Sequence, residues 1–343
     1  MTEFTELIPG LPEEIALECF TRLHYTDHQV ATRVCRRWRE LLQSKEFYYH
    51  RRQTGHTRKA ACLVQALPVQ TGSDGDKPVR PPAYGVSLFD PVSGIWERID
   101  PVPKYPNGLP LFCQILSSEG KVVIVGGWDP VSYESVKDVF VYEFTTRRWR
   151  RGKDMPGKRS FFAAGELNGR VIVAGGHDES KNALSSAWVY DVRRDEWDEL
   201  TPMGQERDEC EGVVIGSEFW VVSGYGTESQ GSFEGSAESL ELGTGQWRRV
   251  EDAWGQTRCP RSCVGVGKDG KLFCWAESDS SVGVGACAVE LGDRTFVSGS
   301  AYQGAPQGFF MVDKNEGQND KLKRLDVPDR FLGFVQSGCC LEL

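Results

Sequence analysis

The sequence predicts a mainly β protein, a β-propeller preceded by a small helical domain, and a repeat is the first reason. Four tryptophans, Trp96, Trp149, Trp197 and Trp247, recur at intervals of 53, 48 and 50 residues, and each follows an apolar residue by seven positions. Turn residues separate short apolar runs within these intervals. A period of about fifty residues predicts four short strands per unit, and such units bury their faces only against one another around a central axis.

The fullest unit runs from Phe161 to Trp197 and is similar to a kelch-type blade. Its second apolar run ends in Gly175 and Gly176, where glycine permits positive φ and lets the backbone turn close to the axis. Tyrosine and tryptophan are large and carry one polar atom each, which suits the wedge between adjacent sheets. We therefore interpret these landmark residues as packing positions rather than binding positions.

The repeat becomes irregular toward the C-terminus. Residues 290–299 match residues 166–175 and open a sixth unit, but the preceding landmark, residues 271–275, lies only about half a period earlier. The sequence therefore favours six blades with a compressed fifth, and five blades is the alternative count. The first unit begins near Ala60 without an outer-register partner strand, and the chain ends in an orphan strand around residues 333–341. Pairing the two would close the ring and remove an exposed edge.

Length and composition fit this arrangement. With 343 residues and 39% hydrophobic content, the chain has material for one large β domain plus a small unit. It has no apolar run long enough to cross a bilayer, and residues 1–6 are acidic rather than basic, so we expect a cytoplasmic and/or nuclear protein with no membrane partner. A net charge of -9 argues against nucleic acid as a partner.

The eleven cysteines are odd in number and scattered, as expected of reduced core residues. Cys259 and Cys263 alone make a weak zinc signal, and we predict no metal site. The rival class is an enzyme, because some kelch propellers carry a copper oxidase centre. Four of the five histidines fall in the N-terminal region and leave His177 alone in the propeller, which excludes a site built on paired imidazoles there. We predict a non-catalytic protein without a cofactor.

The N-terminal region has a helical period. Apolar residues recur in two stripes: Ile15, Cys19 and Leu23, then Val30, Val34, Trp38 and Leu41. The stripes predict two amphipathic helices separated near residues 24–27. We expect a helical domain over residues 1–50, a linker helix or connection over 51–59, and a propeller over 60–343.

Residues 7–20, with the Leu11-Pro12 opening, and residues 34–41, with the Val-Cys-x-x-Trp signature, resemble an F-box. An F-box followed by kelch repeats is an arrangement typical of plants. Within that class the chain is similar to the KISS ME DEADLY group of F-box/kelch proteins, judged on residues 108–113, 160–162, 206–210 and 336–342.

The resemblance implies the substrate receptor of a cullin-RING ubiquitin ligase. The F-box would dock on a Skp-type adaptor, and through it on cullin and a RING protein, while the propeller holds the protein to be degraded. The residues expected to bind the adaptor are Ile8, Leu11, Pro12, Ile15, Cys19, Leu23, Val34 and Trp38. Members of the group target type-B response regulators of cytokinin signalling and phenylalanine ammonia-lyase of phenylpropanoid metabolism. The alternative is a kelch scaffold outside any ligase, with the helices as a cap on the propeller.

One face of the propeller is predicted to bind substrate. In an antiparallel blade, the start of the first strand and the end of the second lie at one end. The residues expected there are Trp128, His177, Tyr225 and Tyr302, which follow the glycine pairs or their counterparts, and Arg159, Arg207 and Arg261, which precede the turn glycines Gly169, Gly216 and Gly270 by ten, nine and nine residues. Arginine and aromatic residues are enriched in binding hot spots, and arginine can grip carboxylates bidentately. The alternative is that the arginines only satisfy loop carbonyls.

Overall fold

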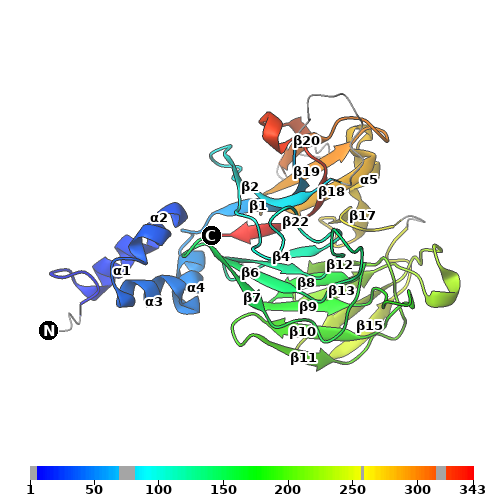
Figure 1. Ribbon diagram of the computed structural model, residues 1–343, viewed down its shortest axis with the longest axis horizontal. Helices are drawn as coiled ribbons and strands as arrows, with labels where there is room; N and C mark the ends of the chain where they lie inside the picture. The colour runs from blue at the N-terminus through cyan, green and yellow to red at the C-terminus, as the bar shows by residue number, and fades with distance from the viewer. Residues whose placement is uncertain (1–5, 69–81, 256–258, 314–321) are drawn as a thin grey trace.

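The computed structural model describes residues 6–68, 82–255, 259–313 and 322–343. It shows an N-terminal helical domain set against one end of a β-propeller, with the C-terminus lying beside helix α4 (Figure 1). The predicted mainly β class and the helical N-terminus are both confirmed. Within the described ranges, none of the helices combines the length and apolar character needed to cross a bilayer.

Four helices form the N-terminal domain: α1 (Glu13–Thr21), α2 (Tyr25–Ala31), α3 (Arg36–Gln43) and α4 (Lys45–Gln53). The prediction of two helices was therefore wrong, because α2 begins inside the expected separator and the second stripe is broken at residues 32–35. His24 accepts a hydrogen bond from the Thr26 backbone N–H at the start of α2, and Cys35 accepts one from Trp38 at the start of α3. These polar caps set boundaries that an apolar period does not reveal.

The helical domain has a small core of its own, built from Leu7, Ala16, Phe20, Ala31, Leu42 and Phe47. Trp38 packs edge-on against Phe20, with ring centroids 4.7 Å apart, and its indole N–H donates to the Leu7 carbonyl at 2.7 Å. Helix α4 carries the buried Arg51, whose guanidinium donates to the Thr21 carbonyl at 3.1 Å. This bond fastens α4 to the end of α1, and α4 runs across the boundary expected at residue 50.

Six sheets form the propeller in the described part of the chain. Written from the innermost strand outward, blade 1 has β22 (Val335–Glu342), β1 (Lys59–Ala66), β2 (Tyr84–Phe89) and β3 (Trp96–Arg98). Blade 2 has β4 (Gln114–Ser118), β5 (Lys121–Val125), β6 (Val139–Glu143) and β7 (Arg148–Gly152). Blade 3 has β8 (Ala163–Leu167), β9 (Arg170–Ala174), β10 (Ala187–Asp191) and β11 (Glu196–Leu200). Blade 4 has β12 (Glu211–Ile215), β13 (Glu218–Val222), β14 (Ala237–Glu241) and β15 (Gln246–Val250). Blade 5 has β16 (Val264–Val266) and β17 (Leu272–Cys274), and blade 6 has β18 (Val284–Glu290), β19 (Arg294–Ser300), β20 (Gly308–Asp313) and β21 (Lys323–Arg324).

The last strand of the chain closes the ring, as predicted. Strand β22 pairs antiparallel with β1, from Lys59 opposite Glu342 to Gln65 opposite Val335. It occupies the innermost position of blade 1 and not the outer position that the sequence suggested, because β3 already pairs with the outer edge of β2. The first and last segments of the chain therefore share one sheet, which removes the exposed edge of each.

Blade 5 is the compressed blade that the sequence predicted, because it has two strands in the described part of the chain. After β17 the chain turns into the short helices α5 (Trp275–Ser278) and η2 (Ser280–Val282). Buried side chains fill the space of the missing outer strands: Trp254, Trp275 and Val282 lie in one hydrophobic cluster with residues of blades 4 and 6. Blades 4 and 6 thus share a core across the thin sheet between them.

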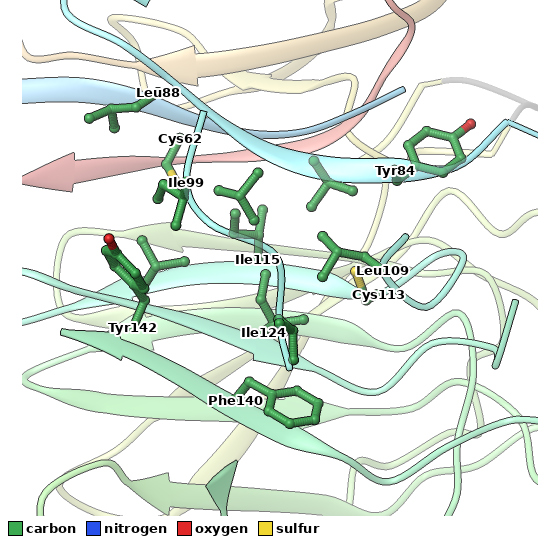
Figure 2. Packing of buried hydrophobic residues seen from close by; sticks show 14 of the residues in the cluster. Cys62, Tyr84, Leu88, Ile99, Leu109, Cys113, Ile115, Ile124, Phe140 and Tyr142 are labelled. Atoms are coloured by element: carbon green, nitrogen blue, oxygen red, sulfur yellow. The ribbon is translucent and has the colours of Figure 1, made fainter. Parts of the chain in front are cut away.

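The repeat tryptophans pack between blades, which confirms their interpretation as packing residues. Three of the four indole N–H groups donate to backbone carbonyls of the preceding blade connection: Trp149 to Asp100 at 2.6 Å, Trp197 to Lys153 at 2.8 Å and Trp247 to Thr201 at 2.6 Å. Each bond satisfies the polar atom of a half-buried ring. Figure 2 shows the core between blades 1 and 2, where Cys62 and Leu88 of β1 and β2 lie on one side of the cluster and Ile115 and Ile124 of β4 and β5 on the other.

Candidate functional site

The six innermost strands surround a central channel with a cavity volume of about 680 Å³. Each blade contributes lining residues, among them Gln114, Gly165, Glu211, Val264, Val289 and Gly338. The two ends of this channel differ, because the inner strands all begin at one end and finish at the other.

The helical domain contacts the end where the inner strands finish. The Thr32 hydroxyl donates to the Thr145 carbonyl at 3.0 Å, and the Gln43 amide donates to the Thr145 hydroxyl at 3.3 Å. Thr145 lies in the turn between β6 and β7. The Thr57 hydroxyl donates at 2.6 Å to Glu342, the last residue of β22. The opposite end of the channel is therefore the one left open by this domain.

At that opposite end, four blades hold a residue in the left-handed backbone conformation two positions before the inner strand. These residues are Phe112, Phe161, Glu209 and Ser262, with φ of 59°, 55°, 49° and 57°. Together with Arg261 they are called the channel mouth. Such φ values are unusual for residues other than glycine and cost of order 1–3 kcal/mol each, and strain of this kind concentrates at functional sites.

The glycine pairs support the channel mouth, which confirms the expected close approach of the backbone. A Cβ atom on Gly127 would lie 2.6 Å from the Leu111 carbonyl oxygen, and one on Gly176 would lie 2.3 Å from the Ser160 carbonyl oxygen. These carbonyls belong to the residues just before Phe112 and Phe161. Any larger residue at either glycine would therefore push the strained turns out of place.

Aromatic rings of blades 2 and 3 cluster at the channel mouth. The ring centroid of Phe161 lies 5.0 Å from that of Phe112, 5.4 Å from that of Trp128 and 5.4 Å from that of His177. The Trp128 indole donates to the Ser160 hydroxyl at 2.5 Å, which fixes its plane. Trp128 and His177 thus lie where the sequence placed them, but Phe112 and Phe161 form the centre of the cluster.

Arg261 reaches this cluster from blade 5. Its guanidinium carbon lies 4.5 Å from the Phe161 ring centroid and 5.1 Å from that of Phe112, which is cation–π geometry. The two ring centroids lie only 5.0 Å apart, so both rings contact the guanidinium from the same side. Among the described residues, no carboxylate lies within ion-pair distance of Arg261, and the side chain is only half-buried. It therefore presents free donors to solvent.

Arg159 and Arg207 do not reach the surface, so their assignment as substrate contacts requires correction. They are only 3% and 1% exposed. Arg159 donates to the carbonyls of Gly175 and Ser186 at 3.2 and 3.1 Å. Arg207 donates to the Ser223 carbonyl at 2.8 Å and forms an ion pair of 3.1 Å with Glu238. Both arginines satisfy loop and strand groups, which was the alternative that the sequence left open.

A one-residue offset separates these two arginines from Arg261. Arg159 and Arg207 stand four positions before the first residues of β8 and β12, whereas Arg261 stands three positions before β16. Neighbouring side chains of an extended segment point in opposite directions. The offset therefore turns Arg261 toward the channel mouth and the other two arginines into the blade.

The remaining residues predicted to contact substrate do not lie on one surface. His177 and Tyr225 are buried, and the His177 Nδ1 lies 2.9 Å from both carboxylate oxygens of Asp208. They support the channel mouth from below and leave little surface for a partner. Tyr302 is 67% exposed on blade 6, and no contact among the described residues ties it to the aromatic cluster.

Polar contacts join the channel mouth around the ring. The Phe112 backbone N–H donates to the Gln336 amide oxygen at 3.0 Å, and the Ser262 hydroxyl donates to the Gln336 carbonyl at 3.0 Å. The Ser262 backbone N–H donates to the Glu211 carboxylate at 2.6 Å. Burial raises the pKa of Glu211 to about 7, and the bond from Ser262 and the charge of Arg261 only partly oppose this rise.

On the helical domain, the expected adaptor-binding residues fall into two groups. Leu11, Pro12, Ile15, Cys19 and Val34 are exposed. Ile8, Leu23 and Trp38 are partly buried against the small core, so their first role is packing. Val30 is exposed as well, although the sequence did not single it out for binding. The exposed apolar side chains leave this domain with surface suited to a protein partner.

Comparisons with known proteins agree with this two-part architecture. The F-box domain model matches residues 8–50, and the model of the KLHDC2/KLHL20/DRC7 Kelch-repeats domain matches residues 55–274. Among solved structures, that of YjhT has 15% sequence identity over 66% of this chain and 67% of that chain, with a TM-score of 0.38.

Curated relatives share both parts. The F-box/kelch-repeat protein At1g15670 of Arabidopsis thaliana is 36% identical over 98% of this chain and 100% of its own length. F-box/kelch-repeat protein At2g44130 is 39% identical over 80% and 73%, and F-box/kelch-repeat protein SKIP20 is 38% identical over 73% and 67%, both from the same organism. With an F-box domain on one end of a propeller and full-length similarity to these proteins, the chain belongs to the F-box/kelch-repeat family of plants.

Proposed function

We propose that the protein is the substrate-recognition subunit of an SCF-type ubiquitin ligase, and that its channel mouth holds the substrate. An F-box followed by kelch repeats is in general a substrate adaptor: the F-box binds a Skp-type adaptor, and the propeller binds the protein to be ubiquitinated. Cullin and a RING protein would join through the adaptor. The family is generally non-catalytic, so the ligase chemistry belongs to those partners.

One observation carries the proposal: the F-box domain and the channel mouth lie at opposite ends of the inner strands. Contacts of Thr32 and Thr57 hold the helical domain at the finishing end, while Phe112, Phe161 and Arg261 gather at the beginning end. Adaptor and substrate can therefore bind at once without competing for surface. Loops on a rigid scaffold are where binding specificity usually resides, and the mouth is made of such loops.

The resemblance to the KISS ME DEADLY group supplies the substrates to test first. Type-B response regulators would make the protein a negative regulator of cytokinin signalling, and phenylalanine ammonia-lyase would make it a regulator of phenylpropanoid synthesis. We propose that it acts in the cytoplasm, the nucleus or both, as expected from the sequence. Nucleic acid and membranes are not proposed as partners, in keeping with the net charge of -9.

The adaptor half of the proposal is tested with a charge on the exposed face of α1. Ile15 is 52% exposed, so Ile15→Glu should leave the fold intact while placing a carboxylate in a desolvated interface. We expect a loss of adaptor affinity of about 30-fold or more, measured by titrating purified adaptor. Val92→Glu is the matched control, because Val92 is 69% exposed on the propeller. Equal adaptor affinity of Ile15→Glu and the control would reject the F-box interface.

The substrate half is tested by reconstituted ubiquitination. The ligase containing the wild-type chain should ubiquitinate a type-B response regulator or phenylalanine ammonia-lyase, and the Ile15→Glu chain should not. A chain that binds adaptor normally but supports ubiquitination of neither protein would retain the ligase assignment and remove both substrates. A chain that binds no adaptor at all would favour the non-ligase scaffold.

A further inference from the structure

We propose that the channel mouth recognises a single carboxylate side chain, an Asp or Glu carried by an apolar segment of the substrate, with Arg261 as its partner. This inference rests on the proposed function and names the chemistry of the substrate. It is carried by the guanidinium of Arg261, which has no ion-pair partner among the described residues, by acidic residues at the same end of the channel, and by exposed apolar residues there.

The aromatic platform holds Arg261 in place for a charged partner. Phe161 and Phe112, from blades 3 and 2, support the guanidinium of blade 5 at 4.5 and 5.1 Å. A flexible arginine loses side-chain entropy when it grips a ligand, and stacking removes part of that cost before binding. The planar N–H edge that remains free matches a carboxylate, which can accept two parallel hydrogen bonds.

The neighbouring charges favour one negative charge over two. Asp208 is within 2.9 Å of His177 at the base of the aromatic cluster, and Glu209 belongs to the channel mouth. A phosphate carries close to two negative charges and would be repelled by these carboxylates about twice as strongly as Asp or Glu. Arg261 is the arginine of the mouth that has no ion-pair partner among the described residues, and one guanidinium matches one carboxylate.

Exposed apolar residues lie where the inner strands of blades 6 and 1 begin, at the same end of the channel as the mouth. Val284, Leu332 and Phe334 are exposed, and a Cβ atom on Gly285 would lie 2.7 Å from the Phe334 ring. Gln336, two residues after Phe334, is the residue whose amide accepts from Phe112. Apolar residues beside the bound carboxylate would cover this surface, which explains why the segment is expected to be apolar around its acidic residue.

The test uses capped peptide pools of about nine residues, with Glu fixed at the centre and Ala, Leu, Val, Phe or Gly elsewhere. Matched pools carry Gln or phosphoserine at the centre, and a fourth pool is apolar with a free C-terminal carboxylate. Binding to the full-length protein is measured by fluorescence anisotropy. A charge-assisted bidentate contact should make the Glu pool bind about tenfold or more tightly than the Gln pool.

Arg261→Gln should erase the preference for Glu over Gln, and Arg261→Lys, which keeps the charge but not the planar edge, should retain only part of it. Arg330→Gln is the matched control, because Arg330 also stacks on a phenylalanine, 5.0 Å from the Phe331 centroid, and is not part of the mouth. The inference is overturned by equal binding of Glu and Gln pools, by a stronger phosphoserine or C-terminal pool, or by an unchanged preference in Arg261→Gln. Normal ubiquitination by the wild-type ligase alongside such a result would leave the proposed function standing and reject the ligand class alone.

Discussion

Blades 4 and 5 follow each other in the ring, but they differ in the residue that stands four positions before the inner strand and in how it packs. Blade 4 has four strands, and its third strand, β14, supplies Glu238 to the buried Arg207. In the described part of the chain blade 5 has two strands, and no third strand there accepts an inward arginine. At the register position of Arg207, four residues before its inner strand, blade 5 carries Pro260, which has no side-chain donor to satisfy.

The difference shows how an incomplete repeat can acquire a binding role. In blade 4, Arg207 is buried and its guanidinium bonds to groups of the propeller, because a buried charge without partners would be costly in free energy. In blade 5 the arginine lies one position later and leaves the sheet for the channel mouth, where aromatic rings of blades 2 and 3 support it. The compressed blade thus loses internal hydrogen-bonding groups and gains one cation at the proposed binding surface.

The largest expected effect comes from the side chains that replace the missing strands. Trp254 is 2% exposed in the core shared by blades 4 and 6, so Trp254→Ala should lower the free energy of unfolding by about 3–5 kcal/mol. Trp247→Ala, on the outer strand of the complete blade 4, should cost only about 1–3 kcal/mol because that ring is already partly solvated. Urea unfolding of both variants provides the measurement. Equal losses would show that the two blades are filled in the same way.

The two arginines provide a second, sharper comparison. Arg207→Met leaves the buried Glu238 without its ion-pair partner and should lower the free energy of unfolding by about 3–5 kcal/mol. Arg261→Met should lower it by about 1 kcal/mol or less, mainly through loss of the cation–π contact. Adding Glu238→Met to Arg207→Met should recover part of the loss, since the stranded charge is then removed. Thermal unfolding decides the matter. A loss for Arg261→Met as large as that for Arg207→Met would make Arg261 a structural residue.

The architecture was accessible from the sequence because it depends on repeated short-range patterns. The spacing of Trp96, Trp149, Trp197 and Trp247 revealed the blades, and the short interval before residues 271–275 revealed the compressed one. Ring closure followed from two unpaired ends. The position of β22 inside blade 1 did not follow, because a strand pattern contains no information on which edge of a sheet it will join.

The orientations of the site residues depend on where the strands begin and end, which the repeat period does not indicate. Arg207 and Arg261 both precede a turn glycine by nine residues, but Gly216 is the first residue after β12 whereas Gly270 is the fourth after β16. Counting from glycine therefore hid the one-residue offset that separates the two side chains. Phe112 and Phe161 were missed for a related reason: their shared signal is the place two residues before an inner strand, which requires the strand boundaries to be known.

The smallest expected effect is a pH dependence at the junction of the two blades. Glu211 of blade 4 accepts the Ser262 N–H of blade 5, and burial raises the pKa of its carboxyl group from 4.5 to about 7. Because folded Glu211 then holds its proton more tightly than the unfolded chain does, its contribution to the free energy of unfolding falls as the pH rises from about 4.5 to about 7. Glu211→Gln removes this contribution.

Near pH 4 the variant should be as stable as the wild type. At pH 8 its free energy of unfolding should be higher than that of the wild type by about 1–2 kcal/mol. This difference is smaller than the full pKa shift implies, because water in the channel screens the charge. Urea titrations of both proteins at the two pH values measure the difference. Equal stability of wild type and variant at pH 8 would show that Glu211 is solvated and that its pKa is not raised at the contact between blades 4 and 5.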